Sequence, residues 1–214
     1  MPNLANKLET IMLKIILYSI GNLTGILLFT LLCVATFQRY QQTHEFLTFS
    51  LIMVNGLILA LYFIRHEPKA LIKFPFAWFI SIVATLLPFL YRPSDLVALP
   101  ELLNLGRYVQ MFGMVAMIGS LLSLRDSLGI VPANRGIKSG GFYRYVRHPL
   151  YTSELIFFTG YSLSNQSIAN GCLLLLLCAL QYCRSKIEEN FLLNDQDYRL
   201  YMSRTPYRFI PGVL

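Results

Sequence analysis

The charged residues of this 214-residue chain are gathered into short segments that separate long uncharged runs. Four such runs hold 24, 19, 18 and 17 residues, and they lie between Lys14 and Arg39, Glu45 and Arg65, Lys73 and Arg92, and Arg107 and Arg125. A helix needs roughly 20 residues to cross about 30 Å of hydrocarbon. The pattern therefore predicts four membrane-spanning helices.

The stretch from Pro149 to Cys183 has 35 residues, which is too many for one span and few for two. Polar residues at Ser164-Asn165-Gln166-Ser167 interrupt it near the middle, which predicts a helical hairpin with both arms entering from one face. Further on, helical spacing predicts a cytoplasmic amphipathic helix through Ile187, Phe191, Asn194, Tyr198 and Tyr201. The expected fold is an all-α integral membrane protein that forms one domain, residues 1–214.

Composition and charge agree with this class. Apolar residues make up 55% of the chain and charged residues 14%, whereas soluble domains average about 45–50% and about 25%. With the N-terminus inside, 15 of the 18 Lys and Arg residues fall on the inner side and three, Arg39, Arg92 and Arg107, fall outside. The split predicts a multi-pass protein with both termini in the cytoplasm. The net charge of +7 is then a topology signal and an attraction to anionic lipid, and nothing indicates nucleic-acid binding.

A first polar cluster lies just before the hairpin, in the segment from Gly141 to Tyr151. Arg144, Arg147 and Pro149 are expected of an inner loop that leads into a helix. That interpretation leaves unexplained Ser139-Gly140-Gly141 and the three tyrosines that follow, because glycine permits close backbone approach to a ligand and aromatic rings can wall an adenine ring. The segment is therefore a candidate ligand site.

A second polar cluster, Arg184 with Glu188 and Glu189, lies at the far end of the hairpin. Arg184 and Glu188 have the spacing of a helical ion pair, which is the simpler interpretation. Two adjacent carboxylates beside an apolar span are costly unless they are used or paired, so Glu188 or Glu189 could instead hold an ammonium group. Arg184 could then bind a carboxylate or phosphate of a substrate.

The cysteines and histidines show no metal-ligand spacing, so no metal site is expected. The cysteines, Cys33, Cys172, Cys178 and Cys183, lie in or beside apolar runs and are interpreted as small apolar residues.

The C-terminal half resembles the isoprenylcysteine carboxyl methyltransferase and phospholipid methyltransferase group of membrane enzymes. The resemblance rests on Ser127–Ala133, the Arg147-His148-Pro149-x-Tyr151 element, Glu188-Glu189, Tyr198, Tyr201, Pro206 and Ile210-Pro211. It implies S-adenosylmethionine as the cofactor and no metal. Phe142, where many relatives have proline, and Thr152-Ser153, which replace a frequent glycine, depart from the pattern of the group.

The resemblance also implies roles for individual residues. The cofactor pocket would be lined by Arg135, Gly136, Ile137, Lys138, Tyr143, His148, Pro149, Leu150, Tyr151 and Glu188, with Glu189 as a further candidate. Arg184 corresponds to the residue implicated in substrate handling, and Arg184 and Glu188 are the candidate catalytic residues. Residues 1–124 would then serve the acceptor side, and residues 125–214 would form the cofactor-binding and catalytic half.

We therefore predict methyl transfer from S-adenosylmethionine, in a cytoplasmic pocket, to a lipophilic acceptor that enters from the bilayer. The reaction would be most like isoprenylcysteine carboxyl O-methylation, because a carboxylate needs no strong base at neutral pH. Phospholipid amines and small thiols are alternative acceptors. A different class, a non-catalytic assembly or transport protein, would use polar residues inside the spans, for which Asn22, Asn55 and Gln181 are the candidates.

Overall fold

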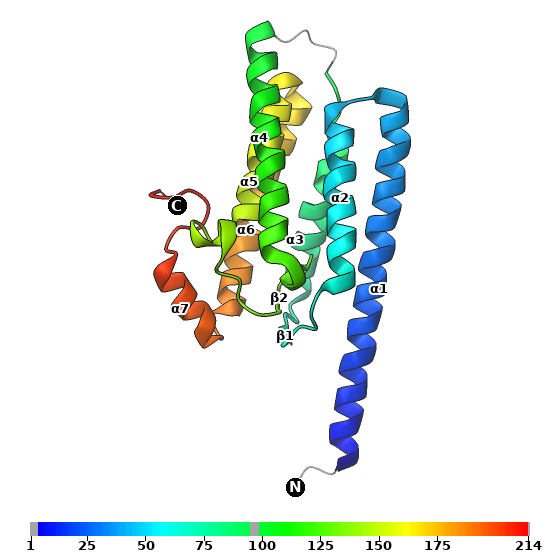
Figure 1. The fold of residues 1–214 in the computed structure, drawn as a ribbon, viewed down its shortest axis with the longest axis vertical. Helices are drawn as coiled ribbons and strands as arrows, with labels where there is room; N and C mark the ends of the chain where they lie inside the picture. The colour runs from blue at the N-terminus through cyan, green and yellow to red at the C-terminus, as the bar shows by residue number, and fades with distance from the viewer. Residues whose placement is uncertain (1–3, 95–98, 214) are drawn as a thin grey trace. The chain divides into compact units, whose positions relative to one another are not determined.

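The computed structural model describes residues 4–94 and 99–213, with side chains of the first helix described at Met12, at Ile16 and from Tyr18 onward. The described chain is mostly helical with almost no strand, which confirms the predicted all-α class (Figure 1). It divides into two compact units, Met1–Pro68 and Lys69–Leu214. Lys7 and Lys14, both counted in the charge split, have side chains outside the described set.

The first unit is a hairpin of α1 (Leu4–Thr43) and α2 (Phe46–Ile64). The helices approach closely at Gly25, where a side chain would collide with the Tyr62 ring. At the end of α2, the guanidinium of the buried Arg65 lies 4.1 Å from the Tyr62 ring centre, and its Nε donates a 2.6 Å hydrogen bond to Asn22 Oδ1. Asn22, a candidate transport residue by sequence, is therefore a partner of Arg65.

The second unit contains the remaining elements. In chain order they are β1 (Ala70–Leu71), α3 (Pro75–Leu86), η1 (Leu87–Leu90), α4 (Pro100–Leu124), η2 (Arg125–Ser127), β2 (Ala133–Asn134), η3 (Gly141–Arg144), α5 (Pro149–Ser164), α6 (Ile168–Leu192) and α7 (Gln196–Arg204). The two short strands pair antiparallel, with Ala70 opposite Asn134 and Leu71 opposite Ala133.

Four helices of the described chain are long and apolar enough to cross a membrane: Tyr18–Thr43, Phe46–Ile64, Pro100–Ser127 and Ile168–Leu192. Three correspond to predicted spans. The run between Lys73 and Arg92 instead forms a shorter apolar segment, Pro75–Leu90, because α3 ends at Leu86 and tightens into η1 around Pro88. The fourth candidate is α6, the second arm of the predicted hairpin.

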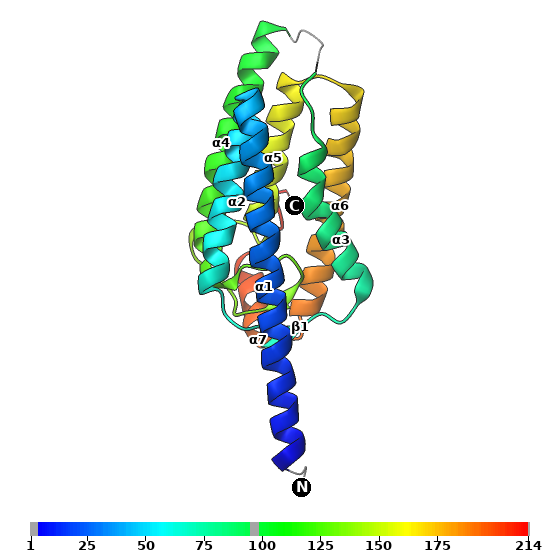
Figure 2. The ribbon, with the colours of Figure 1, turned by 90° about the vertical axis from the view of Figure 1, so that its right-hand side faces the viewer.

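The hairpin of α5 and α6 turns where the sequence predicts (Figure 2). The Ser167 hydroxyl accepts a 3.0 Å hydrogen bond from the backbone of Asn170 and begins α6. The buried Asn170 side chain donates 2.9 Å hydrogen bonds to the carbonyls of Asn165 and Arg92. The turn backbone therefore has protein partners.

Helices α4 and α5 are in backbone contact through glycine. A Cβ at Gly113 would lie 2.5 Å from the backbone nitrogen of Phe157, and one at Gly106 would lie 2.6 Å from the carbonyl oxygen of Gly160. A Cβ at Gly160 would in turn collide with the backbone of Gln110. This contact fixes the first arm of the hairpin against α4.

The predicted amphipathic helix from Ile187 to Tyr201 is two helices. Helix α6 continues to Leu192, and α7 begins after Asp195, whose carboxylate accepts a 2.8 Å hydrogen bond from the backbone of Asp197. This N-cap separates the two helices because its own backbone is extended rather than helical. Tyr198 and Tyr201 therefore lie on α7, whereas Ile187 and Phe191 lie on α6.

Candidate active site

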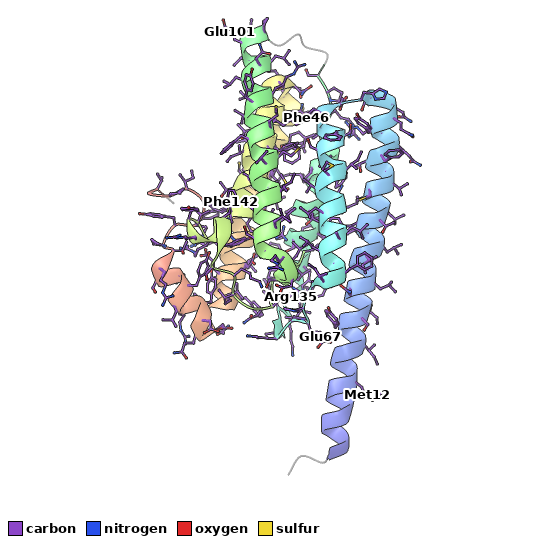
Figure 3. The ribbon with its side chains drawn as sticks, viewed as in Figure 1. Met12, Phe46, Glu67, Glu101, Arg135 and Phe142 are labelled. Carbon is purple, nitrogen blue, oxygen red and sulfur yellow. The ribbon has the colours of Figure 1, made fainter. Side chains whose placement is uncertain are left out.

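A pocket in the second unit lies where the start of α5 meets the far end of α6. Its empty volume, which includes space open to solvent, is about 500 Å³. Figure 3 shows one wall residue, Arg135, near the C-terminal end of α4. The walls are Leu124, Ser127, Gly129, Val131, Ala133, Arg135, Tyr143, Arg147, His148, Leu150, Tyr151, Arg184 and Glu188.

The pocket brings together residues of both polar clusters. The predicted site residues on its walls are Arg135, Tyr143, His148, Leu150, Tyr151, Arg184 and Glu188. Those that do not line it are Gly136, Ile137, Lys138, Pro149 and Glu189. Arg147 and the loop residues Ser127, Gly129, Val131 and Ala133 line it although no site role was predicted for them. The loop residues were nevertheless part of the segment Ser127–Ala133 that carried the resemblance.

Tyr151 and Glu188 join the two arms of the hairpin. Pro149 begins α5 as its first residue, which places Tyr151 on the first turn of that helix. The Tyr151 hydroxyl donates a 2.7 Å hydrogen bond to Glu188 Oε2 on α6. The His148 ring stacks on the Tyr151 ring with centres 5.2 Å apart. The Arg-His-Pro-x-Tyr element and the first glutamate thus share one site.

Arg184 lies one helical turn from Glu188 and is 8% exposed. Its Nη2 donates a 2.5 Å hydrogen bond to the carbonyl of Ile130, and its Cζ lies 4.9 Å from the Tyr151 ring centre. Its Nε is buried and has no hydrogen-bond partner among the described residues. Within the same residues, no ion pair of 4.0 Å or less joins Arg184 to Glu188, so the helical ion-pair interpretation does not hold.

Glu189, in contrast, is 4% exposed and faces three cationic or ionisable side chains. Its Oε1 accepts hydrogen bonds from Arg147 Nε at 2.8 Å and Arg208 Nε at 3.1 Å, and it lies 3.1 Å from His148 Nε2. Its Oε2 accepts a 2.5 Å bond from Arg208 Nη2. These contacts hold Glu189 off the pocket walls and make it a tie between α6, the loop before α5 and the C-terminal segment.

That C-terminal segment, residues 205–209, forms a strap along the start of α5. The backbone nitrogens of Arg147 and His148 donate to the carbonyls of Tyr207 and Arg208 at 2.9 and 3.0 Å. The Thr152 hydroxyl donates a 3.0 Å bond to the carbonyl of Phe209. The strap therefore fixes the backbone of two pocket residues.

The predicted segment Arg135–Lys138 contributes its first residue to the pocket, and the others have partners elsewhere. Gly136, at φ +100°, has a conformation that suits glycine, and its nitrogen donates to Asn134 Oδ1 at 3.0 Å. Ile137 packs against the buried tyrosine cluster of Tyr143, Tyr198 and Tyr201. Lys138 forms a 2.5 Å ion pair with Asp126.

The tyrosine cluster supports the pocket wall from behind. The Tyr201 hydroxyl donates a 2.7 Å hydrogen bond to the carbonyl of Tyr143. Burial, and then the nearby Glu188 carboxylate, raise the pKa of the Tyr143 hydroxyl, which keeps it protonated and able to donate. Tyr198 and Tyr201 therefore pack against Tyr143, and Tyr201 also anchors its backbone.

One polar residue of the hairpin, Glu154, was not predicted from the sequence. Glu154 lies on α5 one turn beyond Tyr151, and its Oε2 accepts a 2.6 Å hydrogen bond from Gln181 Nε2 on α6. The signal was present in the sequence, because Glu154 is the single carboxylate between Pro149 and Cys183, and a carboxylate within an apolar span marks a functional site by default.

Comparison with known protein families gives one match. Residues 105–195 match the phospholipid methyltransferase family. This match confirms the predicted family resemblance and supports a membrane methyltransferase. A comparison with curated proteins gives no significant match.

All thirteen wall residues of the pocket fall inside this phospholipid methyltransferase region. Helix α7 and the strap, which support the pocket, lie beyond it. Enzymes of the phospholipid methyltransferase family generally use S-adenosylmethionine. Among residues 4–94 and 99–213, no group of three or more His, Cys, Asp or Glu side chains could hold a metal ion.

The pocket residues fit the polar groups of S-adenosylmethionine. Its ammonium and carboxylate need an anionic and a cationic partner, and the walls offer Glu188 and Arg135. Its adenine needs apolar walls, which the Tyr143 ring and the Leu150 side chain can supply.

Proposed function

We propose that this protein is an S-adenosylmethionine-dependent methyltransferase that acts on a lipophilic acceptor delivered from the bilayer. The observation that carries the proposal is the joint presence of His148, Tyr151, Arg184 and Glu188 on one pocket, at the end of two helices of a membrane-type hairpin. In this proposal the cofactor enters the pocket from the aqueous side and the acceptor enters from the lipid.

In this proposal Glu188 holds the ammonium group of the cofactor, with Tyr151 fixing the carboxylate by its hydrogen bond. Arg135, Tyr143, His148, Leu150 and Tyr151 supply the remaining contacts. Gly136, Ile137, Lys138, Pro149 and Glu189 act by shaping the loop, the start of α5 and the strap.

Arg184 is proposed to bind an anionic group of the acceptor. Its buried Nε has a proton to donate and no described partner, and a carboxylate is the ligand that its planar fork suits best. This supports a carboxyl acceptor of the isoprenylcysteine type as the first to test. Phospholipid amines are the second candidate, because Glu154 places a carboxylate one turn deeper in the hairpin.

Methyl transfer requires little of the protein beyond alignment of the cofactor with the acceptor. The cofactor supplies an activated methyl group when bound. In this proposal Arg184 orients the acceptor. The buried cluster of Tyr143, Tyr198 and Tyr201 keeps water from the side of the pocket wall that it covers, and burial keeps the Tyr143 hydroxyl protonated. A carboxylate acceptor is already deprotonated at neutral pH and needs no base.

A cytoplasmic pocket and cytoplasmic termini belong to the same proposal. They rest on the 15 to 3 division of Lys and Arg along the chain. The division of labour between an acceptor side, residues 1–124, and a catalytic half, residues 125–214, also remains a proposal.

The test is calorimetric titration of S-adenosylmethionine into the full chain in lipid nanodiscs, followed by methyl transfer from labelled cofactor to a membrane lipid extract. Saturable binding with label in an extracted acceptor supports the proposal. An absence of saturable binding to the folded protein contradicts it and favours a non-catalytic membrane protein.

A further inference from the structure

Glu154 is the one charged residue of α5, and it is partly buried in the second unit. A carboxylate at such a position costs free energy unless it is paired with a donor or used by a ligand. Its described hydrogen-bond partner is Gln181 Nε2, at 2.6 Å. Figure 2 shows the two helices that carry this pair, α5 and α6, as neighbouring arms of the hairpin.

Gln181 presents a second acceptor that lacks a donor. Its side chain is fully buried, and its Oε1 has no hydrogen-bond partner among the described residues. A buried amide oxygen without a donor is unfavourable, so native proteins usually supply one. The pair therefore offers a carboxylate and an amide oxygen at one place, and the donor that would satisfy the amide oxygen is missing.

Neither Glu154 nor Gln181 lines the pocket itself, but each lies one helical turn from a residue that does. Glu154 follows Tyr151 by three residues on α5, and Gln181 precedes Arg184 by three on α6, so each pair of positions shares a helix face. Arg184 does not satisfy the pair, because its described contacts are the Ile130 carbonyl and the Tyr151 ring. No ion pair of 4.0 Å or less joins Arg184 to Glu154 within the described chain.

We propose that Glu154 and Gln181 form a subsite for a hydrogen-bond-donating group of the ligand, an N–H or O–H, one helical turn deeper than Arg184. That the ligand of this subsite is the methyl acceptor rests on the proposed function. Binding of an N–H or O–H group at the subsite does not depend on it. Together with Arg184, the subsite selects an amphiphile that carries an anionic group and, about one helical turn (~5.4 Å) away, an amine or hydroxyl.

The experiment compares three probes with the same alkyl chain, dodecylamine, dodecanol and dodecanoate, on the full chain in phosphatidylcholine nanodiscs. This lipid is suitable because its head group has no N–H or O–H donor. Binding is measured by calorimetry, with protein-free nanodiscs as the blank. The variants are Glu154→Gln, Glu154→Asp and Gln181→Leu. The matched control is Glu101→Gln, at an exposed position of α4.

We expect saturable binding of dodecylamine, dodecanol or both, and dodecanoate binding that does not depend on Glu154. Glu154→Gln should weaken dodecylamine binding by about 10-fold or more, because it removes a charge-assisted hydrogen bond. Glu154→Asp should retain part of the affinity, Gln181→Leu should lower it, and Glu101→Gln should leave it unchanged.

Equal dodecylamine affinity in the native chain, Glu154→Gln and Gln181→Leu would overturn the subsite. Titration of S-adenosylmethionine on the same samples separates the two proposals. A chain that binds dodecylamine through Glu154 but does not bind the cofactor keeps the subsite and loses the methyltransferase.

Discussion

The Tyr151 hydroxyl donates a 2.7 Å hydrogen bond to Glu188 and thereby joins residues 37 positions apart in the sequence. It connects the first turn of α5 to the far end of α6 and fixes a carboxylate at the pocket wall. The bond is the shortest direct link between the two polar clusters among the described hydrogen bonds.

Tyr151→Phe removes this bond and keeps the ring that stacks on His148 and lies beside Arg184. A hydrogen bond to a charged group contributes about 1.5–3 kcal/mol, so we expect cofactor affinity to fall roughly 10-fold or more. The measurement is calorimetric titration of S-adenosylmethionine. Tyr145→Phe, at a residue that is 64% exposed, is the control and should bind normally. Equal affinity in both variants would contradict the role given to Tyr151.

Glu188 and Glu189 should respond differently to the same change. Glu189→Gln leaves Arg147 and Arg208 without their buried counter-ion, and breaking such a pair costs roughly 3–5 kcal/mol. We therefore expect a clear fall in the thermal unfolding temperature. Glu188→Gln should lower cofactor affinity with a smaller change in that temperature. Thermal scanning measures the unfolding temperature of the two variants, and calorimetry measures their cofactor affinity. Equal unfolding temperatures would contradict the role of Glu189 in holding the strap.

Arg184→Lys keeps a positive charge and loses the planar fork. If Arg184 binds the acceptor, turnover should fall while cofactor affinity changes little. Near-normal turnover in this variant would remove Arg184 from acceptor binding. Methyl transfer and cofactor binding are measured on one sample, beside Arg107→Lys on an exposed face of α4.

The contact between Asp195, which caps α7, and Asn134 should weaken at acidic pH. A 2.5 Å hydrogen bond from Asn134 lowers the pKa of Asp195, and the carboxylate caps α7. A lowered folded-state pKa contributes stability above the unfolded value of about 3.9, and this is lost as pH falls through the folded value. Asp195→Asn does not titrate, so its stability should depend less on pH below about 4. Thermal scans across that range measure the difference, and parallel curves would exclude Asp195 as the titrating group.

The orientation is tested by cysteine labelling from the outside of intact cells, in a variant that lacks the four native cysteines. A cysteine at Thr43 should react and one at Lys138 should not, because the charge split places them on opposite sides. The reverse pattern would place the pocket away from the cytosolic cofactor.

The sequence predicted those parts of the fold that depend on length and hydropathy. The runs before Arg39, Arg65 and Arg125 became long helices, and the turn after Ser164 formed where polar residues interrupt the hairpin. The run before Arg92 did not form a helix long enough to span a membrane, because the helix tightens into a 3-10 turn at Pro88. A count of uncharged residues does not detect this effect.

The candidate site was predictable where it depends on side-chain type and not where it depends on backbone contacts. The tyrosine and glutamate motifs identified the pocket walls at Tyr151 and Glu188. The strap is held by the carbonyls of Tyr207, Arg208 and Phe209, which any residue type could supply, so no residue pattern reveals it. Glu189 was assigned to the cofactor because adjacent carboxylates cannot be told apart by sequence alone.

The glycine contact between α4 and α5 has a consequence for genetics. Gly106, Gly113 and Gly160 each lie against backbone atoms of the opposite helix, so even alanine would push the two helices apart. None of the three lines the pocket. A random-mutagenesis screen for lost activity should therefore return substitutions at these glycines as often as at the pocket walls, and such a hot spot would report helix spacing rather than chemistry.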